Sequence, residues 1–130
     1  MNLSPKASVL LVEDEPSIRK IFRDLLSHEG YEVWEAEDGE IGLRFAQNKP
    51  DLVLLDLVLP KVNGWEVCRR IRNSPATQKT PIIVFSMLDG EQESKRAMEC
   101  GATAYMVKGS SRLREILTKI NELLPKGDKQ

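Results

Sequence analysis

The stretch VLLVEDEP, residues 9–16, decides the fold of this 130-residue chain. Residues 9–12 are all aliphatic, which is typical of a strand that is buried on both faces of a parallel sheet. Three acids end this run, and Pro16, a residue favoured in the first turn of a helix, follows them. Apolar residues then recur from Ile18 to Leu26 at the spacing of one helical face, and Gly30 stands where a helix cap belongs. The stretch therefore predicts a buried strand that runs through an acidic junction into an amphipathic helix.

The same alternation continues to the end of the chain. Short apolar runs predict four further strands, at residues 31–36, 52–55, 81–85 and 103–107. Amphipathic stretches predict four further helices, at residues 39–48, 64–73, 91–100 and 111–124. Strands separated by helices form parallel, right-handed crossovers. We therefore predict an α/β fold, a single doubly wound five-stranded parallel sheet in the flavodoxin-like order 2-1-3-4-5 with five helices.

Length and composition exclude several classes of protein. We expect one domain over residues 1–130, with a core at about 8–124, a leader at 1–7 and a polar tail at 125–130. Nineteen Lys and Arg against 20 Asp and Glu give no basic excess, so we expect no direct binding to nucleic acid. Two cysteines make no disulfide framework, and no apolar run approaches the roughly 20 residues that cross a bilayer. We expect a cytoplasmic protein with no membrane contact, either complete in this chain or part of a longer one.

Polar side chains end the predicted strands. In an open α/β sheet, ligands bind beyond the carboxyl ends of the strands, where the strand order reverses. The first strand ends at Glu13 and Asp14, the third at Asp56, the fourth at Ser86 and the fifth at Lys108. Carboxylates that cluster repel one another unless a cation lies between them. An all-oxygen set without His or Cys favours Mg²⁺, with Mn²⁺ as the alternative.

The same residues suit a phosphoryl group. An aspartate can act as the nucleophile of phosphoryl transfer through an aspartyl phosphate. A lysine and a serine facing the same point supply the charge and the hydrogen bond that a phosphoryl group needs. The residues by themselves therefore predict a Mg²⁺-dependent site that handles a phosphoryl group on a carboxylate.

From Ser8 to Leu124 the chain resembles a receiver domain of the response regulators of two-component signalling, with a fold like that of the chemotaxis regulators. The resemblance is carried, in chain order, by residues 9–16, 30–33 with 36–39, 51–60 with Asn63-Gly64, 81–86, and Gly101-Ala102 with Tyr105 and Lys108. Each piece is weak alone, but together, in this order and at strand ends, they are highly specific.

The resemblance implies a role for each site residue. Asp56 is the expected phosphoacceptor, and Asp14 and Asp56 are the expected direct ligands of Mg²⁺. Glu13 is expected to act on the metal through water, and the backbone carbonyl of Val58 to complete the protein ligands.

Three further residues take roles from the same resemblance. Lys108 is expected to pair with the phosphoryl group. Ser86 is expected to move toward that group and bind it, and the Tyr105 rotamer is expected to follow the movement of Ser86.

The resemblance also implies partners. A histidine kinase or a histidine phosphotransfer protein is expected to donate the phosphoryl group. The helix at 91–100, the strand at 103–107 and the last helix are expected to present the switched surface to a downstream effector protein. The domain is expected to catalyse its own phosphorylation and dephosphorylation without being a turnover enzyme, as a monomer or weak dimer.

Three positions depart from the family pattern. Gly109 follows Lys108, where the family usually has a proline, often after a cis bond. Thr103-Ala104 stands where receivers of dimerising transcription factors often carry acids, which argues against a dimer of that type. Val58 and Leu88 are apolar near the expected phosphoryl site, and we hypothesise that they slow hydrolysis and that Val58→Asn speeds dephosphorylation.

Simpler interpretations of single residues stay open from the sequence. Asp14 is an equally good helix cap, a lone lysine such as Lys108 is most often solvated, and Tyr105 is also expected as a partly buried core aromatic. The cysteines, Cys68 and Cys100, are expected as small apolar helix residues.

Three alternative functions can be compared with the site residues. A receiver-like module that signals without phosphorylation would keep the same fold. An aspartyl-phosphate phosphatase of the haloacid dehalogenase type needs an acid where Val58 stands. A flavin-binding electron carrier needs a phosphate loop where Glu13, Asp14 and Glu15 stand.

Overall fold

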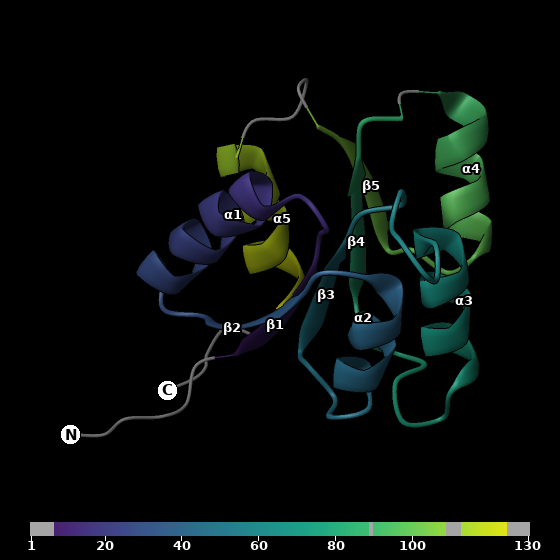
Figure 1. Cartoon of the computed structure of the whole chain (residues 1–130), viewed down its shortest axis with the longest axis horizontal. Coiled ribbons are helices and arrows are strands. Elements are labelled where there is room, and N and C mark those ends of the chain that lie inside the picture. Colours follow the sequence, from purple (N-terminus) through teal and green to yellow (C-terminus); the bar gives the residue numbers. More distant parts are fainter. Residues whose placement is uncertain (1–6, 89, 109–112, 125–130) are drawn as a thin grey trace.

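The structure is a computed structural model that describes residues 7–88, 90–108 and 113–124 (Figure 1). Five strands alternate with five helices along the described chain. The strands are β1 (Ser8–Val12), β2 (Glu32–Ala36), β3 (Leu52–Leu55), β4 (Ile82–Ser86) and β5 (Ala104–Val107). The helices are α1 (Pro16–His28), α2 (Gly39–Ala46), α3 (Gly64–Asn73), α4 (Glu91–Glu99) and α5 (Leu113–Leu123).

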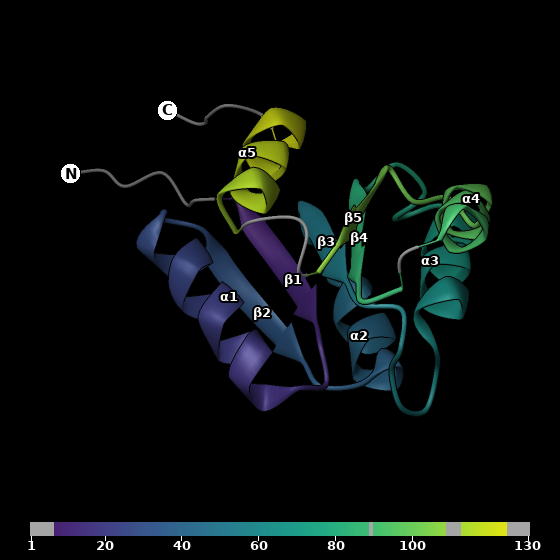
Figure 2. The same cartoon turned by 90° about the horizontal axis from the view of Figure 1, so that it is seen from above.

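All strand pairs are parallel, and the sheet order is β2-β1-β3-β4-β5. The predicted doubly wound sheet is thereby confirmed. Helices α1 and α5 cover one face, and α2, α3 and α4 cover the other (Figures 1 and 2). Because strand order reverses between β1 and β3, the loops after these two strands diverge to opposite faces of the sheet and leave a site between them.

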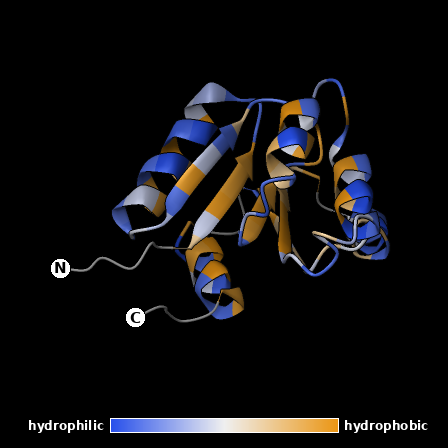
Figure 3. Cartoon of the chain, turned by 90° about the horizontal axis from the view of Figure 1, so that it is seen from below, coloured by the Kyte–Doolittle hydropathy of each residue, from blue (hydrophilic) through white to orange (hydrophobic). Residues whose placement is uncertain are grey.

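The core is built by strands whose neighbouring side chains enter opposite layers. In β1, Leu10 and Val12 pack under α2 and α3, whereas Val9 and Leu11 pack under α1 and α5. Every residue of β1, β3 and β4 is buried, as the continuous apolar runs predict. The edge strands β2 and β5 are only partly buried. Figure 3 shows this layering, with hydrophobic central strands and hydrophilic outer faces on the helices.

Element ends differ from the sequence prediction by a few residues. Ser86 belongs to β4 itself, and α2 stops at Ala46, because the next residues turn and Lys49 has a φ of 58°. Gly30 adopts a φ of 96° just after α1, which confirms it as the residue that ends this helix. The predicted start of the last helix at residue 111, and the Lys108–Gly109 bond, lie outside the described residues.

The capping interpretation of Asp14 is wrong. The N-cap of α1 is Glu15, and no side chain caps the helix there. Asp38 and Asn63 cap α2 and α3 instead, each accepting a backbone N–H three residues ahead.

Among the described residues, no helix combines the length and the apolar character that a membrane crossing requires.

Candidate functional site

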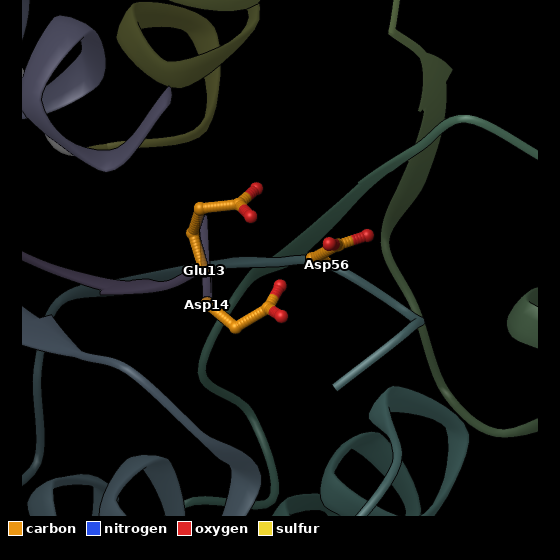
Figure 4. Close-up of side chains that lie close together, drawn as sticks. All are labelled: Glu13, Asp14 and Asp56. Atoms are coloured by element: carbon orange, nitrogen blue, oxygen red, sulfur yellow. The ribbon is translucent and has the colours of Figure 1, made fainter. Parts of the chain in front are cut away.

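Three carboxyl groups converge where the strand order reverses. Glu13 and Asp14 follow β1, Asp56 follows β3, and one oxygen from each lies within 4.8 Å of the other two. The Asp56 amide donates to Val12 O at 3.0 Å, which extends the pairing of β1 and β3 by one residue and sets Asp56 beside the acidic junction. Figure 4 shows the Glu13 and Asp14 side chains extending from the end of β1 toward Asp56. The predicted convergence of these acids is therefore observed.

The three acids differ in exposure. Glu13 is fully buried and Asp56 is 5% exposed, whereas Asp14 is open to solvent. The Glu15 amide donates to Glu13 Oε2 at 2.9 Å, which holds the buried carboxyl in place. The site therefore has two carboxyls in the protein interior and a third at its mouth.

Lys108 lies against both buried carboxyls. Its Nζ donates to Glu13 Oε1 at 2.7 Å and to Asp56 Oδ2 at 3.2 Å, and it stands 4.8 Å from the centre of the Phe85 ring. Its backbone amide donates to Ser86 O at 2.7 Å, so the end of β5 is tied to the end of β4. The interpretation of Lys108 as a solvated surface lysine is thus wrong, because its side chain is only 12% exposed.

Burial disfavours the charges of this cluster. Desolvation raises the pKa of Asp56 above its ordinary value, against Lys108 and against hydrogen bonds from the backbone of Val58 and Leu57, which favour the ionised form. Desolvation also raises the pKa of Glu13, with repulsion from Asp56 adding to it. For Lys108, burial lowers the pKa, but the Glu13 and Asp56 carboxylates outweigh this and raise it overall. Three carboxylates facing one ammonium form a site that a divalent cation would stabilise.

Ser86 and Tyr105 both hold the loop between β4 and α4. Ser86 is fully buried, and its Oγ accepts from the Leu88 amide at 3.1 Å. The Tyr105 hydroxyl donates to Leu88 O at 2.6 Å, and the ring is half-buried, as its core interpretation predicts. Leu88 is thus fixed by one bond to β4 and one bond to β5. Val58, by contrast, leaves its side chain 60% exposed beside Asp56.

The start of α3 packs onto the loop that carries Asp56. A Cβ at Gly64 would lie 2.3 Å from Asp56 O and 2.5 Å from Leu57 Cα, so a larger side chain cannot fit there without moving the loop. The Gly64 amide also donates to Leu57 O at 2.8 Å. This close approach is the physical reason for Gly64, whereas the preceding Asn63 caps α3.

Arg19 was not identified from the sequence but touches the site. Its Nη1 donates to Glu13 O at 2.8 Å, and its Nε lies 3.3 Å from Glu35 Oε1 of β2. The sequence does contain a signal for this contact. Arg19 lies one turn into the helix that follows the acidic junction, and Glu35 lies in the strand that pairs with β1. That signal depends on knowing that β2 is the neighbour of β1.

The fold and this cluster define an α/β protein of the flavodoxin-like class with an acidic site at its topological switch point. A family profile, the response regulator receiver domain, matches residues 9–121. The chain belongs to this family.

Individual relatives agree with that assignment. A probable transcriptional regulator, ycf27, of Guillardia theta is 40% identical over an alignment 129 residues long, which covers 94% of this chain and 50% of that protein. The DNA-binding dual master transcriptional regulator RpaA of Synechocystis is 34% identical over 122 residues, 93% of this chain and 50% of that protein. The chain spans about half the length of these curated relatives.

Solved structures show the same fold. The chemotaxis protein CheY4 of Vibrio cholerae is 29% identical, with a TM-score of 0.85 over 92% of this chain and 99% of that one. The BeF3-activated receiver domain of Klebsiella pneumoniae RstA is 27% identical, with a TM-score of 0.84 over 92% and 99%. The resemblance inferred from the sequence is therefore confirmed at the level of family and fold.

Proposed function

We propose that Asp56 accepts a phosphoryl group in a Mg²⁺-dependent reaction, as the receiver of a two-component or phosphorelay system. The observation that carries this proposal is the buried Asp56 carboxyl, set within 3.2 Å of the Lys108 ammonium and beside two further acids. A structural ion pair needs one acid for one amine, whereas this site holds three acids for one amine. The excess negative charge suits a bound cation.

The donor set fits Mg²⁺. Asp14 and Asp56 would ligate the ion directly, Glu13 would act through a water molecule, and the Val58 backbone carbonyl would complete the protein ligands. Mg²⁺ keeps several waters and accepts one or two carboxylates together with phosphate oxygens, and Mn²⁺ can use the same oxygens. The bound ion would neutralise charge on the transferring phosphoryl group.

The remaining residues position the phosphoryl group. An Asp56 oxygen attacks phosphorus, the new P–O bond forms, and the bond from phosphorus to the donor's histidine nitrogen breaks, so that nitrogen leaves with the electron pair. Lys108 then pairs with a phosphoryl oxygen. Ser86 turns toward another oxygen and releases the Leu88 amide, and the Tyr105 ring follows.

The partners follow from this chemistry. The donor is a histidine kinase or a histidine phosphotransfer protein, which places the reaction in the cytoplasm. The surface of α4, β5 and α5 changes with Ser86 and Tyr105 and is read by a downstream effector. Two relatives are named as transcriptional regulators, so an effector that binds DNA is one such output. The domain modifies itself and does not turn over a metabolite.

Incubation with Mg²⁺ and acetyl phosphate, followed by intact-protein mass spectrometry, tests the proposal. The wild-type protein should gain one phosphoryl group, and Asp56→Asn should gain none. Asp24→Asn, which removes an exposed acid on α1, is the control and should be modified like the wild type. Modification of Asp56→Asn, or an unmodified wild type, would contradict the assignment, the latter favouring a receiver-like module that signals without phosphorylation.

A further inference from the structure

We propose that Arg19 is a positioning residue for the acidic site: its guanidinium ties the backbone carbonyl of Glu13 to the Glu35 carboxylate on β2 and so holds the junction in the geometry that binds the metal. The inference rests on the proposed function, because it concerns Mg²⁺ at the same site.

The contacts of Arg19 reach two elements. From α1, Nη1 donates to Glu13 O at 2.8 Å and Nε lies 3.3 Å from Glu35 Oε1. The Arg19 side chain is only 18% exposed, so this bridge is mostly shielded from water. Glu35 is paired in register with Leu11 of β1, which fixes the far end of the bridge to the sheet. A planar guanidinium makes both contacts with one rigid fork.

The bonded carbonyl belongs to the peptide that joins Glu13 to Asp14. Because that peptide is planar, fixing its oxygen also fixes the direction in which the Asp14 amide and Cα leave it. The Glu13 amide is already held by Ala36 O at 3.0 Å. No side chain caps the start of α1. The hydrogen bond from Arg19 therefore fixes the carbonyl end of Glu13, next to the exposed Asp14.

Charge alone predicts the opposite effect. A guanidinium near a cation site repels Mg²⁺, so removing its charge would tighten metal binding if Arg19 acted only through Coulomb forces. If Arg19 acts by positioning, removing it weakens binding even though a repulsive charge is lost. The sign of the change in Mg²⁺ affinity thus separates the two roles.

Arg23 offers a matched control. It lies one turn further along α1 and its Nη1 stands 3.6 Å from the other Glu35 oxygen, Oε2. Arg23 forms ion pairs with Glu35 and Asp24, whereas the Glu13 carbonyl accepts its side-chain hydrogen bond from Arg19. Arg23→Gln removes a similar charge from a similar place while leaving the bridge to the acidic junction intact.

Isothermal titration with Mg²⁺ tests the proposal on the full chain. Loss of a group that orients metal ligands typically weakens metal affinity by about 10–100-fold. We expect Arg19→Gln to raise the Kd for Mg²⁺ by roughly tenfold or more. Arg19→Lys, which keeps the charge but loses the fork, should also weaken binding, and Arg23→Gln should bind like the wild type.

Phosphorylation by acetyl phosphate supplies a second readout. Arg19→Gln should need more Mg²⁺ but approach the wild-type rate once Mg²⁺ saturates, because the nucleophile and Lys108 are untouched. Unchanged or tighter binding in Arg19→Gln, or wild-type binding in Arg19→Lys, would overturn the proposal.

Two further results are decisive. If Arg19→Gln does not fold in EDTA, Arg19→Lys carries the test, since it keeps the positive charge but loses the planar fork; weakened Mg²⁺ binding then supports the proposal and wild-type binding overturns it. A wild-type protein that binds no Mg²⁺ would overturn the proposed function itself, whereas failure of this inference alone appears only in the variants.

Discussion

At the scale of single residues, the site depends on how unequally its acids are exposed. Glu13 and Asp56 are buried beside one ammonium, and Asp14 faces solvent. A buried carboxylate that exceeds its cationic partners is destabilising until a cation arrives. The proposed metal site should therefore lower the stability of the protein when no cation is bound.

Asp56→Asn should stabilise the metal-free protein. Desolvation raises the pKa of Asp56 in the folded protein above its value in the unfolded chain. The protonated carboxyl therefore contributes its full share to folding stability below the unfolded-state pKa, and this contribution is lost as pH rises through the folded-state pKa. The amide does not titrate, so the gain in the variant should grow as pH rises above about 4 and level off above the folded-state pKa of Asp56, at the order of 1 kcal/mol. Urea unfolding in EDTA measures it.

Glu99→Gln is the control for that experiment, since Glu99 is exposed at the end of α4. It should show no such growth with pH. A variant Asp56→Asn that is equally stable or less stable than the wild type at pH 7 in EDTA would show that the buried charge is already compensated.

The two cysteines should differ in reactivity. Cys68 is 1% exposed, and burial raises the pKa of its thiol to about 12, so little thiolate forms at pH 8. Cys100 is partly exposed. Iodoacetamide at pH 8 should alkylate Cys100 and spare Cys68, as read by peptide mass spectrometry, and both should react in guanidinium. Faster labelling of Cys68 in the native protein would contradict the packing of α3.

At the scale of elements, the loops at the two ends of the sheet are held differently. At the carboxyl end, Ser86 and Tyr105 fix Leu88 in the β4–α4 loop through single bonds. At the opposite end, Arg72 joins three segments at once. The loop after β4 is thus held by single side-chain bonds to Leu88, whereas one side chain makes several contacts at the other end of the sheet.

Arg72→Met should destabilise the fold by about 2 kcal/mol. From α3, the guanidinium donates to Gly101 O at 2.8 Å, Thr80 O at 2.6 Å and Thr103 Oγ1 at 3.2 Å. Methionine fills similar space but leaves the Gly101 and Thr80 carbonyls without this donor, while Thr103 Oγ1 keeps only its bond from the Ile82 amide. Urea unfolding measures the loss, and Arg69→Met, at an exposed position of the same helix, should change stability by less than about 0.5 kcal/mol. Equal effects of the two variants would show that the hydrogen bonds of Arg72 do not stabilise the fold.

At the scale of the whole molecule, metal binding should appear as global stability. A ligand that binds only the folded state stabilises it by RT ln(1 + [L]/Kd), about 1.4 kcal/mol at ten times Kd. Mg²⁺ at that level should raise the Tm by roughly 3–6 °C. Asp14→Asn should remove most of the rise, while the fold in EDTA stays intact because Asp14 is exposed. Calorimetric scans measure both, and an equal Mg²⁺ shift in the variant would exclude Asp14 as a ligand.

Much of this molecule was predictable from local pattern. The continuous apolar runs of β1, β3 and β4 and the helical stripes between them identify a parallel sheet, because each pattern reports burial within a few neighbouring residues. Strand ends at Glu13, Asp56 and Lys108 then locate the site, since parallel strands bring their carboxyl ends to one edge. Ser86 ends β4 as expected, and the element bounds that differ, such as the end of α2 at Ala46, do so by one or two residues because local pattern marks element ends poorly.

What the sequence determined by itself is the order of elements, the edge on which chemistry is placed and the residues available there. Only the tertiary structure decided how those residues meet: that Lys108 touches Glu13 more closely than Asp56, that Asp14 is left open to water, and that Arg19 reaches back to the Glu13 carbonyl. The physical reason is that hydrophobic periodicity is read within one element, whereas such contacts join residues up to 95 positions apart and depend on the packing that brings those elements together.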